Sequence, residues 1–287
     1  MRDLSIESFT DNVINSMGPK TPARVREVMT SLIRHLHDFA REVNLTTEEW
    51  LLGVEVLNRT GRMSDDKRNE MILMSDVVGL ESLVDALDHR SQGKETESAV
   101  LGPFYRENAP KLPMGATVVQ GGKPGESVLV QGRVMSGDGA PVAGAIVDVW
   151  ETAPNGLYEQ QDPDQPDMNL RGRFETAADG SYAFRCVRPV SYPVPFDGPA
   201  GELLRLMDRH AFRPAHLHMI VSAPGYETLV TQIFDRTDKY LDSDAVFAVK
   251  DSLVVDFKPA SEGTGAQYVV DHDIRLKAAH ARHRSAA

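Results

Sequence analysis

The stretch RPAHLHMIV, residues 213–221, holds two histidines two positions apart. The surrounding apolar residues predict a strand, in which side chains two apart point to the same face. His216 and His218 can therefore meet at one point while Leu217 packs behind them. The pattern favours a metal site, although two half-buried histidines of an ordinary sheet would give the same sequence.

The same spacing occurs at His35 and His37, which offers a comparison. These residues lie in a segment with helical periodicity, where side chains two apart point to different sides. They cannot share a metal ion, and we interpret them as solvated positions on a helix surface.

Two tyrosines are further candidates: Tyr158 in PNGLYEQQ and Tyr192 in RPVSYPVPF. Both lie in connections rich in proline and glycine, and such loops often hold functional groups over a rigid sheet. Taken alone, each would be interpreted as a partly buried tyrosine with a bonded hydroxyl group. Two imidazoles would also suit zinc, or ferrous iron with a carboxylate as third ligand.

The elements that must position these residues begin with helices. Residues 21–43 carry apolar side chains at three- and four-residue steps, which predicts a helix with Thr21 as N-cap and Pro22 in its first turn. Residues 46–49 have the form of a capping box before a second helix. A third helical stretch is expected from Ser64 to about His89.

The polar segment SQGKETES, residues 91–98, ends this pattern and marks the expected boundary between a helical domain, residues 1–97, and a catalytic domain, residues 98–287. After it the apolar period falls to two, and turn signals separate short strand-like runs. Many short strands without intervening helices predict an α+β, mainly β fold whose catalytic domain is an antiparallel β-sandwich. The expected strands are residues 127–135, 144–150, 181–187, 215–222, 229–234 and 267–276.

Composition excludes several classes of function. The formal net charge of -11 comes without a basic cluster, which argues against nucleic acid as a partner. The N-terminus lacks the features of a signal peptide, and no segment is apolar enough to span a membrane. The only cysteine is Cys186, which excludes an intrachain disulfide and a thiolate metal cluster. We therefore expect a cytoplasmic protein that is not a membrane protein.

Taken together, these residues resemble the intradiol ring-cleaving dioxygenases, a family with an N-terminal helical domain and a β-sandwich that holds iron. The resemblance covers most of the chain, and its order of two tyrosines followed by His-x-His is specific. The similar segments are LMSD at 73–76, LGPFY at 101–105, GAIVDVWETAPNGLY at 144–158, MNLRGRF at 168–174, RPVSYPVP at 188–195 and RPAHLHMIVSAPGYETLVTQIF at 213–234.

The resemblance implies one ferric iron, Fe(III), per chain, because phenolate is a hard anionic donor that favours this ion. It places Arg213 and Gln232 beside the substrate ring, where a permanent positive charge can stabilise developing negative charge. It further implies that Tyr192 leaves the iron when the substrate binds through two adjacent oxygens. O2 then cleaves the bond between the two hydroxyl-bearing carbons. The implied iron ligands are Tyr158, Tyr192, His216 and His218.

The resemblance extends to the substrate pocket. On the helical pattern alone Asp76 would be placed on a solvated edge, but it matches a carboxylate of the subgroup that acts on hydroxyquinol (1,2,4-trihydroxybenzene). A partly buried carboxylate needs a donor, and a third ring hydroxyl supplies one. We therefore expect cleavage of hydroxyquinol to maleylacetate (3-hydroxy-cis,cis-muconate); the alternative is cleavage of catechol to cis,cis-muconate. The other expected pocket residues are Leu73, Val100, Leu101, Gly102, Pro103, Phe104, Val194, Pro195 and Phe196.

Two functions of other classes stay open. One is a non-catalytic sandwich that binds an aromatic molecule or a partner protein. The other is a zinc hydrolase that uses Asp235 together with His216 and His218.

The N-terminal helices are also expected to form a homodimer. Their apolar content, including MILMSDVVGLESLV at residues 71–84, exceeds what one short amphipathic face needs. The resemblance adds an apolar channel at that interface, in which a phospholipid could bind.

Overall fold

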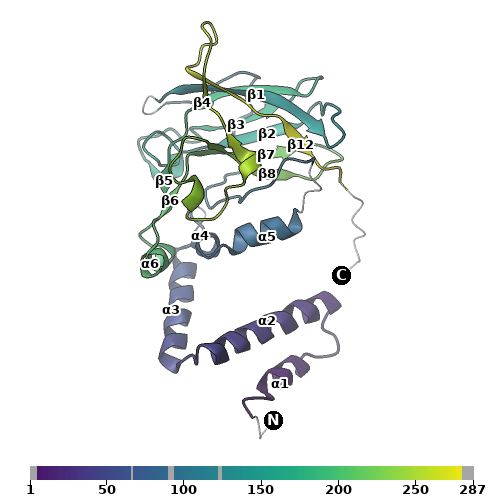
Figure 1. Ribbon diagram of the computed structural model, residues 1–287, viewed down its shortest axis with the longest axis vertical. Helices are drawn as coiled ribbons and strands as arrows, with labels where there is room; N and C mark the ends of the chain where they lie inside the picture. The colour runs from purple at the N-terminus through teal and green to yellow at the C-terminus, as the bar shows by residue number, and fades with distance from the viewer. Residues whose placement is uncertain (1–4, 66, 90–93, 122–124, 280–287) are drawn as a thin grey trace. The chain divides into compact units, whose positions relative to one another are not determined.

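The computed structural model describes residues 5–65, 67–89, 94–121 and 125–279 (Figure 1). The chain divides into two compact units, and the division falls between Asn58 and Arg59. The expected division at residue 97 stays a prediction. In the described residues no helix is long and apolar enough to cross a membrane.

The helices are α1 (Phe9–Asn15), α2 (Ala23–Glu42), α3 (Thr47–Met63), α4 (Glu70–Val77), α5 (Leu80–Asp88) and α6 (Pro199–Leu206), with short 3-10 helices η1 (Glu159–Gln161), η2 (Leu241–Ser243) and η3 (Asp251–Leu253). The strands are β1 (Ser127–Ser136), β2 (Ile146–Trp150), β3 (Arg171–Glu175), β4 (Ser181–Val187), β5 (Tyr192–Pro193), β6 (Phe212–Arg213), β7 (His216–Ser222), β8 (Leu229–Asp235), β9 (Val254–Val255), β10 (Lys258–Pro259), β11 (Tyr268–Asp271) and β12 (Ile274–Leu276).

The starts of the first long helices depend on local side chains. The predicted capping box before α3 is present, because Glu49 accepts the backbone N–H of Thr46 at 2.9 Å and Thr46 accepts that of Glu49 at 3.2 Å. The prediction for α2 is one residue out. Pro22 is its N-cap, since the hydroxyl of Thr21 donates instead to the carbonyl of Gly18.

The helical stretch expected from Ser64 to His89 is two helices rather than one. The N-cap of α4 is Asn69, whose side chain accepts the N–H of Ile72 at 3.1 Å. The break between α4 and α5 falls at Gly79, which has a left-handed φ of 74° that favours glycine. This turn places the end of α4 and the start of α5 close together.

Most strands form two five-stranded sheets. The first has the order β10-β11-β1-β12, with β4 also paired to β1, and the second has the order β3-β2-β7-β8-β9. The prediction of purely antiparallel strands is wrong, because β1 pairs in parallel with β11 and β12, and β8 pairs in parallel with β9. The C-terminal strands β11 and β12 make the first sheet mixed, and β9 makes the second sheet mixed.

The single strand expected over residues 267–276 is divided into β11 and β12. The link between them passes over β1 at Gly132, where a Cβ atom would lie 1.9 Å from the carbonyl oxygen of His272. Only glycine allows this approach, and the same oxygen accepts the hydroxyl of Tyr182 at 2.6 Å. The remaining expected strands lie within a few residues of β1, β2, β4, β7 and β8.

Both sheets contribute to one core. It contains alternate residues of β1, such as Val128 and Val130, together with Val147 of β2 and Leu217 of β7. Leu217 is therefore buried behind the two histidines of its strand, as expected. The opposite face of β7 is thereby left to the functional side chains.

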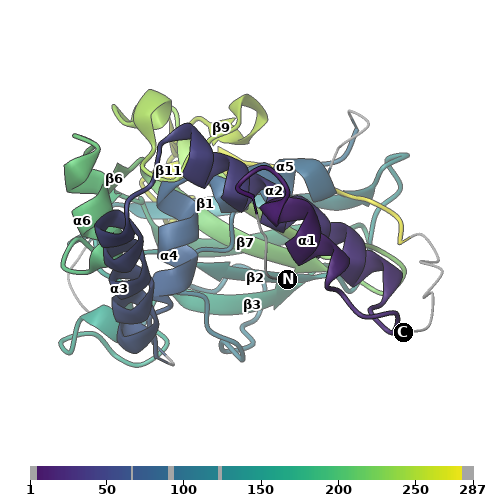
Figure 2. The same cartoon turned by 90° about the horizontal axis from the view of Figure 1, so that it is seen from below.

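A second core lies between the second sheet and the helices α4 and α6. It joins Leu73 and Val77 of α4, Leu204 of α6 and Phe234 of β8. The helix α4 lies below the sheet in Figure 1 and in front of it in Figure 2, so it covers the face to which the histidines point. This covering closes the site against solvent.

Candidate active site

Four ring side chains meet at the covered face of the second sheet. The distance between the hydroxyl oxygens of Tyr158 and Tyr192 is 3.0 Å. The Tyr192 oxygen lies 3.3 Å from Nε2 of His216, and that nitrogen lies 3.1 Å from Nε2 of His218. All four residues are at most 5% exposed.

Neighbouring strands fix the two histidines. His218 pairs with Trp150 of β2 on one side and with Gln232 of β8 on the other. Its ring stacks on the Trp150 indole, with centroids 4.7 Å apart and an interplanar angle of 8°. Gly102 also approaches this ring, since a Cβ atom there would lie 3.3 Å from Cε1 of His218.

The tautomer of His216 follows from its contacts. Its Nδ1 lies 2.7 Å from the carbonyl oxygen of Pro214, which can only accept, so Nδ1 carries the proton and Nε2 presents a lone pair. Burial, followed by the nearby Arg213, holds the pKa of His216 well below its ordinary value. The pKa of His218 is also held well below its ordinary value, by burial and then by His216 and Arg213. Both imidazoles are neutral, which is the form that binds metals.

The two tyrosines arrive from loops. Tyr192 begins β5 and pairs with Arg213 of β6, and Tyr158 immediately precedes η1, where its N–H donates to Gln161 at 3.0 Å. Burial raises the pKa of both phenols above the ordinary value. Ionising them therefore requires a cation at the site.

This donor set fits a metal ion. Three groups, from Arg213, Tyr192 and His218, lie within 3.3 Å of the single lone pair of His216. A cation would satisfy the two imidazole lone pairs and the two phenolates together. Nδ1 of His218, which faces away from this point, is buried with no hydrogen-bond partner in the part of the chain that the structure describes.

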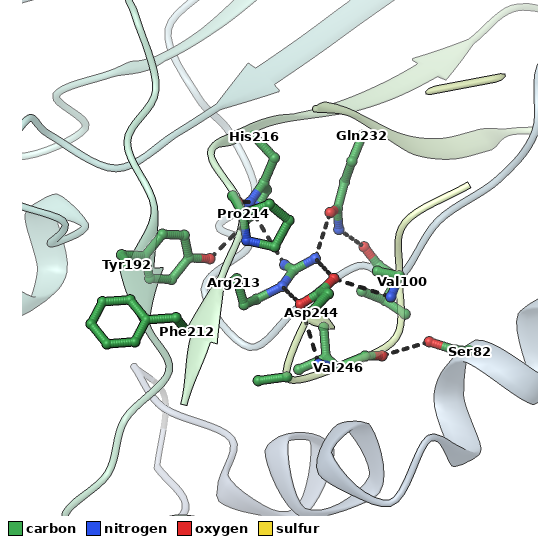
Figure 3. A network of polar contacts seen from close by, with 12 residues as sticks. Ser82, Val100, Tyr192, Phe212, Arg213, Pro214, His216, Gln232, Asp244 and Val246 are labelled. Atoms are coloured by element: carbon green, nitrogen blue, oxygen red, sulfur yellow. Dashed lines mark hydrogen bonds and ion pairs between the residues drawn. The ribbon is translucent and has the colours of Figure 1, made fainter. Parts of the chain in front are cut away.

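Arg213 is buried beside these rings and is held by a carboxylate that the sequence did not single out. Its Nε and Nη2 donate to the two oxygens of Asp244 at 3.1 and 3.2 Å (Figure 3). Asp244 also accepts the N–H groups of Val246 and Ala248. Burial alone would lower the pKa of Arg213, but Asp244 raises it, so the guanidinium stays charged.

Gln232 connects Arg213 to the wall of the site. Its side-chain oxygen accepts from Nη2 of Arg213 at 2.8 Å, and its amide nitrogen donates to the carbonyl of Val100 at 2.6 Å (Figure 3). The strand β8 thus ties Arg213 to the segment that begins at residue 100.

A cleft opens beside the four rings. The predicted residues that line it include Asp76, together with Leu73 of α4. Val246 also lines it and was missed by the sequence analysis, because it lies in a short irregular segment without a motif. The expected pocket residues Val100, Leu101 and Phe196 are not among those that line the cleft: Val100 is buried, Leu101 packs against the cluster that contains the two tyrosines, and Phe196 lies beneath Arg205. The other lining residues are Gly102, Pro103, Phe104, Tyr158, Tyr192, Val194, Pro195, Arg213 and His218.

Arg171 fastens the Tyr158 loop to this wall. Its Nε donates to Glu159 at 2.8 Å, and its Nη2 donates to the carbonyl of Phe104 at 2.9 Å. No local pattern indicated this role, because an arginine in a short strand is usually exposed. Burial of Arg171 also explains why β3 did not follow a two-residue apolar period.

One candidate site from the sequence does not form. Asp235 accepts from Arg188 and Thr237, and the described residues contain no group of three His, Cys, Asp or Glu side chains that could hold a metal. The zinc site of His216, His218 and Asp235 is therefore wrong.

The two histidines of α2 were both expected to be solvated. His35 is exposed, whereas His37 is half-buried and its Nδ1 lies 3.0 Å from the hydroxyl of Thr10.

Comparison with known proteins identifies the class to which this site belongs. A family model described as dioxygenase matches residues 100–278, and one described as the N terminus of catechol dioxygenase matches residues 22–96. The chain belongs to the intradiol ring-cleaving dioxygenases.

Individual relatives are similar over nearly their whole length. The chain is 48% identical to a catechol 1,2-dioxygenase of Candida albicans, with 94% of this chain and 92% of that protein covered. It is 48% identical to a 6-chlorohydroxyquinol 1,2-dioxygenase of Cupriavidus pinatubonensis, with 96% and 99% covered. The crystal structure of hydroxyquinol 1,2-dioxygenase from Pseudomonas putida superimposes with a TM-score of 0.86 at 43% identity, covering 96% of this chain and 99% of that one.

The buried ion pair of Arg213 and Asp244 leads to a stability prediction. Asp244→Asn leaves a buried guanidinium without its counter-charge and is expected to lower the free energy of unfolding by about 3 to 5 kcal/mol. Asp256→Asn is a matched control, because its ion pair with Arg236 has both side chains 55% exposed and should contribute less than about 1 kcal/mol. Denaturant unfolding measures both. Equal losses of unfolding free energy in the two variants would show that the buried ion pair contributes no more to stability than the exposed one.

Proposed function

We propose that this chain is an intradiol dioxygenase that cleaves hydroxyquinol to maleylacetate with a ferric iron held by Tyr158, Tyr192, His216 and His218. The observation that carries the proposal is the convergence of two phenol oxygens and two imidazole nitrogens at one buried point. We further infer that the two sheets, with their shared core, are the layers of a β-sandwich.

The donor types support iron over zinc. Two phenolates are hard, anionic ligands that favour a trivalent ion, whereas zinc sites are built from Cys, His and carboxylate ligands. Ferric iron, when bound, supplies a Lewis acid that takes both adjacent oxygens of the substrate and makes the ring reactive toward O2. Both oxygen atoms of O2 enter the product, so no organic cofactor or reductant is needed.

The chain's own residues bind, orient and deprotonate the substrate. Tyr192 is the phenol nearest Arg213 through its strand pairing, and in the proposed reaction its oxygen takes up a substrate proton. Arg213 holds a fixed positive charge beside the ring, where it stabilises negative charge as that charge develops. Asp244 and Gln232 keep the guanidinium in place, and the walls of the cleft exclude bulk water.

Asp76 supports hydroxyquinol as the substrate. Its side chain is 1% exposed, lines the cleft, and has an Oδ1 atom without a partner among the described residues. A third ring hydroxyl would donate to this oxygen, whereas catechol would leave it unpaired. The identity to relatives does not separate the two substrates, because catechol and chlorohydroxyquinol dioxygenases are both 48% identical to this chain. Catechol is therefore the second candidate.

The N-terminal unit supports a homodimer. The helix α2 has no buried residue, and its apolar side chains Val25, Val28, Leu32, Leu36 and Phe39 are each at least 46% exposed. Such a continuous apolar face needs a cover in water, and a second copy of the chain supplies the same face. The phospholipid that the family resemblance implies would bind among these side chains.

The iron proposal predicts a coloured protein with about one iron per chain, because phenolate bound to ferric iron absorbs visible light. Tyr158→Phe should lose the colour and the activity, since one anionic ligand is removed. Metal analysis and a visible spectrum test this directly. Full ring-cleaving activity in a colourless, iron-free protein would end the proposal.

The Asp76 proposal predicts a change in substrate preference. A buried acceptor left unpaired costs about 1 to 3 kcal/mol, so kcat/KM for hydroxyquinol should exceed that for catechol by at least on the order of tenfold. Asp76→Ala should lower the value for hydroxyquinol and leave or raise the value for catechol. Steady-state kinetics with both substrates on both proteins provide the comparison. An equal proportional loss on the two substrates would mean that Asp76 is only structural.

The dimer proposal predicts that Leu32→Glu combined with Leu36→Glu produces a monomer, because two charges would be buried at the interface. Light scattering at micromolar concentration measures the mass. The control is Arg24→Glu, which changes charge at an exposed position of the same helix. A monomeric parent protein with full activity would contradict the proposal.

A further inference from the structure

A second carboxyl group lies against Asp76 and was not part of the site expected from the sequence. Glu81 is the second residue of α5, and the turn at Gly79 brings it to the end of α4, where Asp76 lies. The two side chains are hydrogen-bonded to each other. Glu81 also accepts the backbone N–H of Leu101 at 3.0 Å, at the start of the LGPFY segment that forms one wall of the cleft.

Two carboxyl groups in contact cannot both be ionised without strong repulsion, so one proton must lie between them. Burial first, and then Glu81, raise the pKa of Asp76 to about 9, despite the opposing effect of Arg213 and with a further contribution from Asp244. The positive charge of Arg213 is already matched by the two oxygens of Asp244. Asp76 therefore keeps a proton at neutral pH, because a raised carboxyl pKa preserves the neutral form below it.

The position of this proton decides which atom faces the substrate. The hydrogen bond between Asp76 and Glu81 uses one carboxyl oxygen of Asp76, which leaves its other carboxyl oxygen for a ligand in the cleft. Asp76 thus presents a hydrogen-bond acceptor, rather than a second donor, to the cleft that it lines. A ring hydroxyl can donate to that acceptor. Because Asp76 and Glu81 together carry only one negative charge, the oxygen of this hydroxyl is not repelled by a second one.

We propose that Glu81 is the positioning residue for substrate selection: it shares one proton with Asp76, leaves the other carboxyl oxygen of Asp76 as the acceptor for the third ring hydroxyl, and ties this pair to the cleft wall through Leu101. The inference rests on the proposed function of Asp76. It adds a residue that touches neither the ring nor the iron ligands and that acts only through Asp76.

A double-mutant cycle tests whether Glu81 acts through Asp76. The quantity measured is the ratio of kcat/KM for hydroxyquinol to kcat/KM for catechol, which cancels effects common to both substrates. Glu81→Ala should lower this ratio on the order of tenfold, as Asp76→Ala does. The double variant should lie within about twofold of Asp76→Ala, because Glu81 has nothing left to position.

Two further variants separate positioning from loss of structure. Glu81→Gln should restore most of the ratio, since an amide can accept from Leu101 and bond to Asp76. Asp85→Ala is the matched control: Asp85 also ties α5 to the rest of its unit, through Lys250 at 2.8 Å, but it does not contact Asp76. This variant should leave the ratio unchanged even if it lowers stability.

The shared proton is measured without turnover. An infrared difference spectrum of the parent protein and Asp76→Ala at neutral pH should show the carbonyl band of one protonated carboxyl group in the parent. Glu151, another buried carboxyl with a raised pKa, is present in both proteins and cancels.

The outcomes distinguish the two proposals. If Asp76→Ala changes the substrate ratio but Glu81→Ala does not, Asp76 selects the substrate without Glu81 and only this inference fails. If Asp76→Ala itself leaves the ratio unchanged, the proposed choice of substrate fails as well. A further fall in the double variant, or the absence of the infrared band, would also overturn the shared-proton pair.

Discussion

The ion pair of Arg213 and Asp244 is the interaction on which the candidate active site depends. A guanidinium is buried at 3% exposure beside two imidazoles and two phenols, and such a charge is tolerated only when each of its directions is satisfied. Asp244 takes two of its N–H groups, and Gln232 takes another. The pair therefore sets the position of the charge, and this charge adds to burial in keeping the neighbouring histidines neutral.

The second sheet provides the rigidity that this arrangement needs. β7 carries both histidines, and it is paired on both sides, by β2 and β8, so neither ring can shift along the strand. The loops that carry the tyrosines are fastened to this frame by separate means. Tyr192 is held by the β5–β6 pairing, and the Tyr158 loop is held by the buried contacts of Arg171. A site built from loops thus acquires the precision of the sheet below it.

The cleft also depends on the helices α4 and α5. Their junction places Asp76 at the cleft and Glu81 beside Asp76. In the proposed function, the four ring side chains would hold the iron, and the helix junction would contact the ring substituents of the substrate.

The features that depend on local chemistry could be predicted from the sequence alone. The apolar period of two located β1, β2, β4, β7 and β8, and the spacing of His216 and His218 placed both rings on one face of a strand. The resemblance to a family added Tyr158, Tyr192, Arg213 and Gln232, which meet in the structure as expected. The phenolate ligands that this resemblance implies also argued for ferric iron.

The contacts that join distant segments became visible only in the folded chain. Asp244, Glu81 and Arg171 carry no local signal, because a carboxylate or an arginine in isolation is expected on the surface. The parallel return of β11 and β12 and the break at Gly79 were missed for a related reason. Periodicity reports which face of an element is buried, but it contains no information about which other element covers that face. That choice is made by packing across the whole chain, and here it converts ordinary charged residues into the buried partners of a catalytic site.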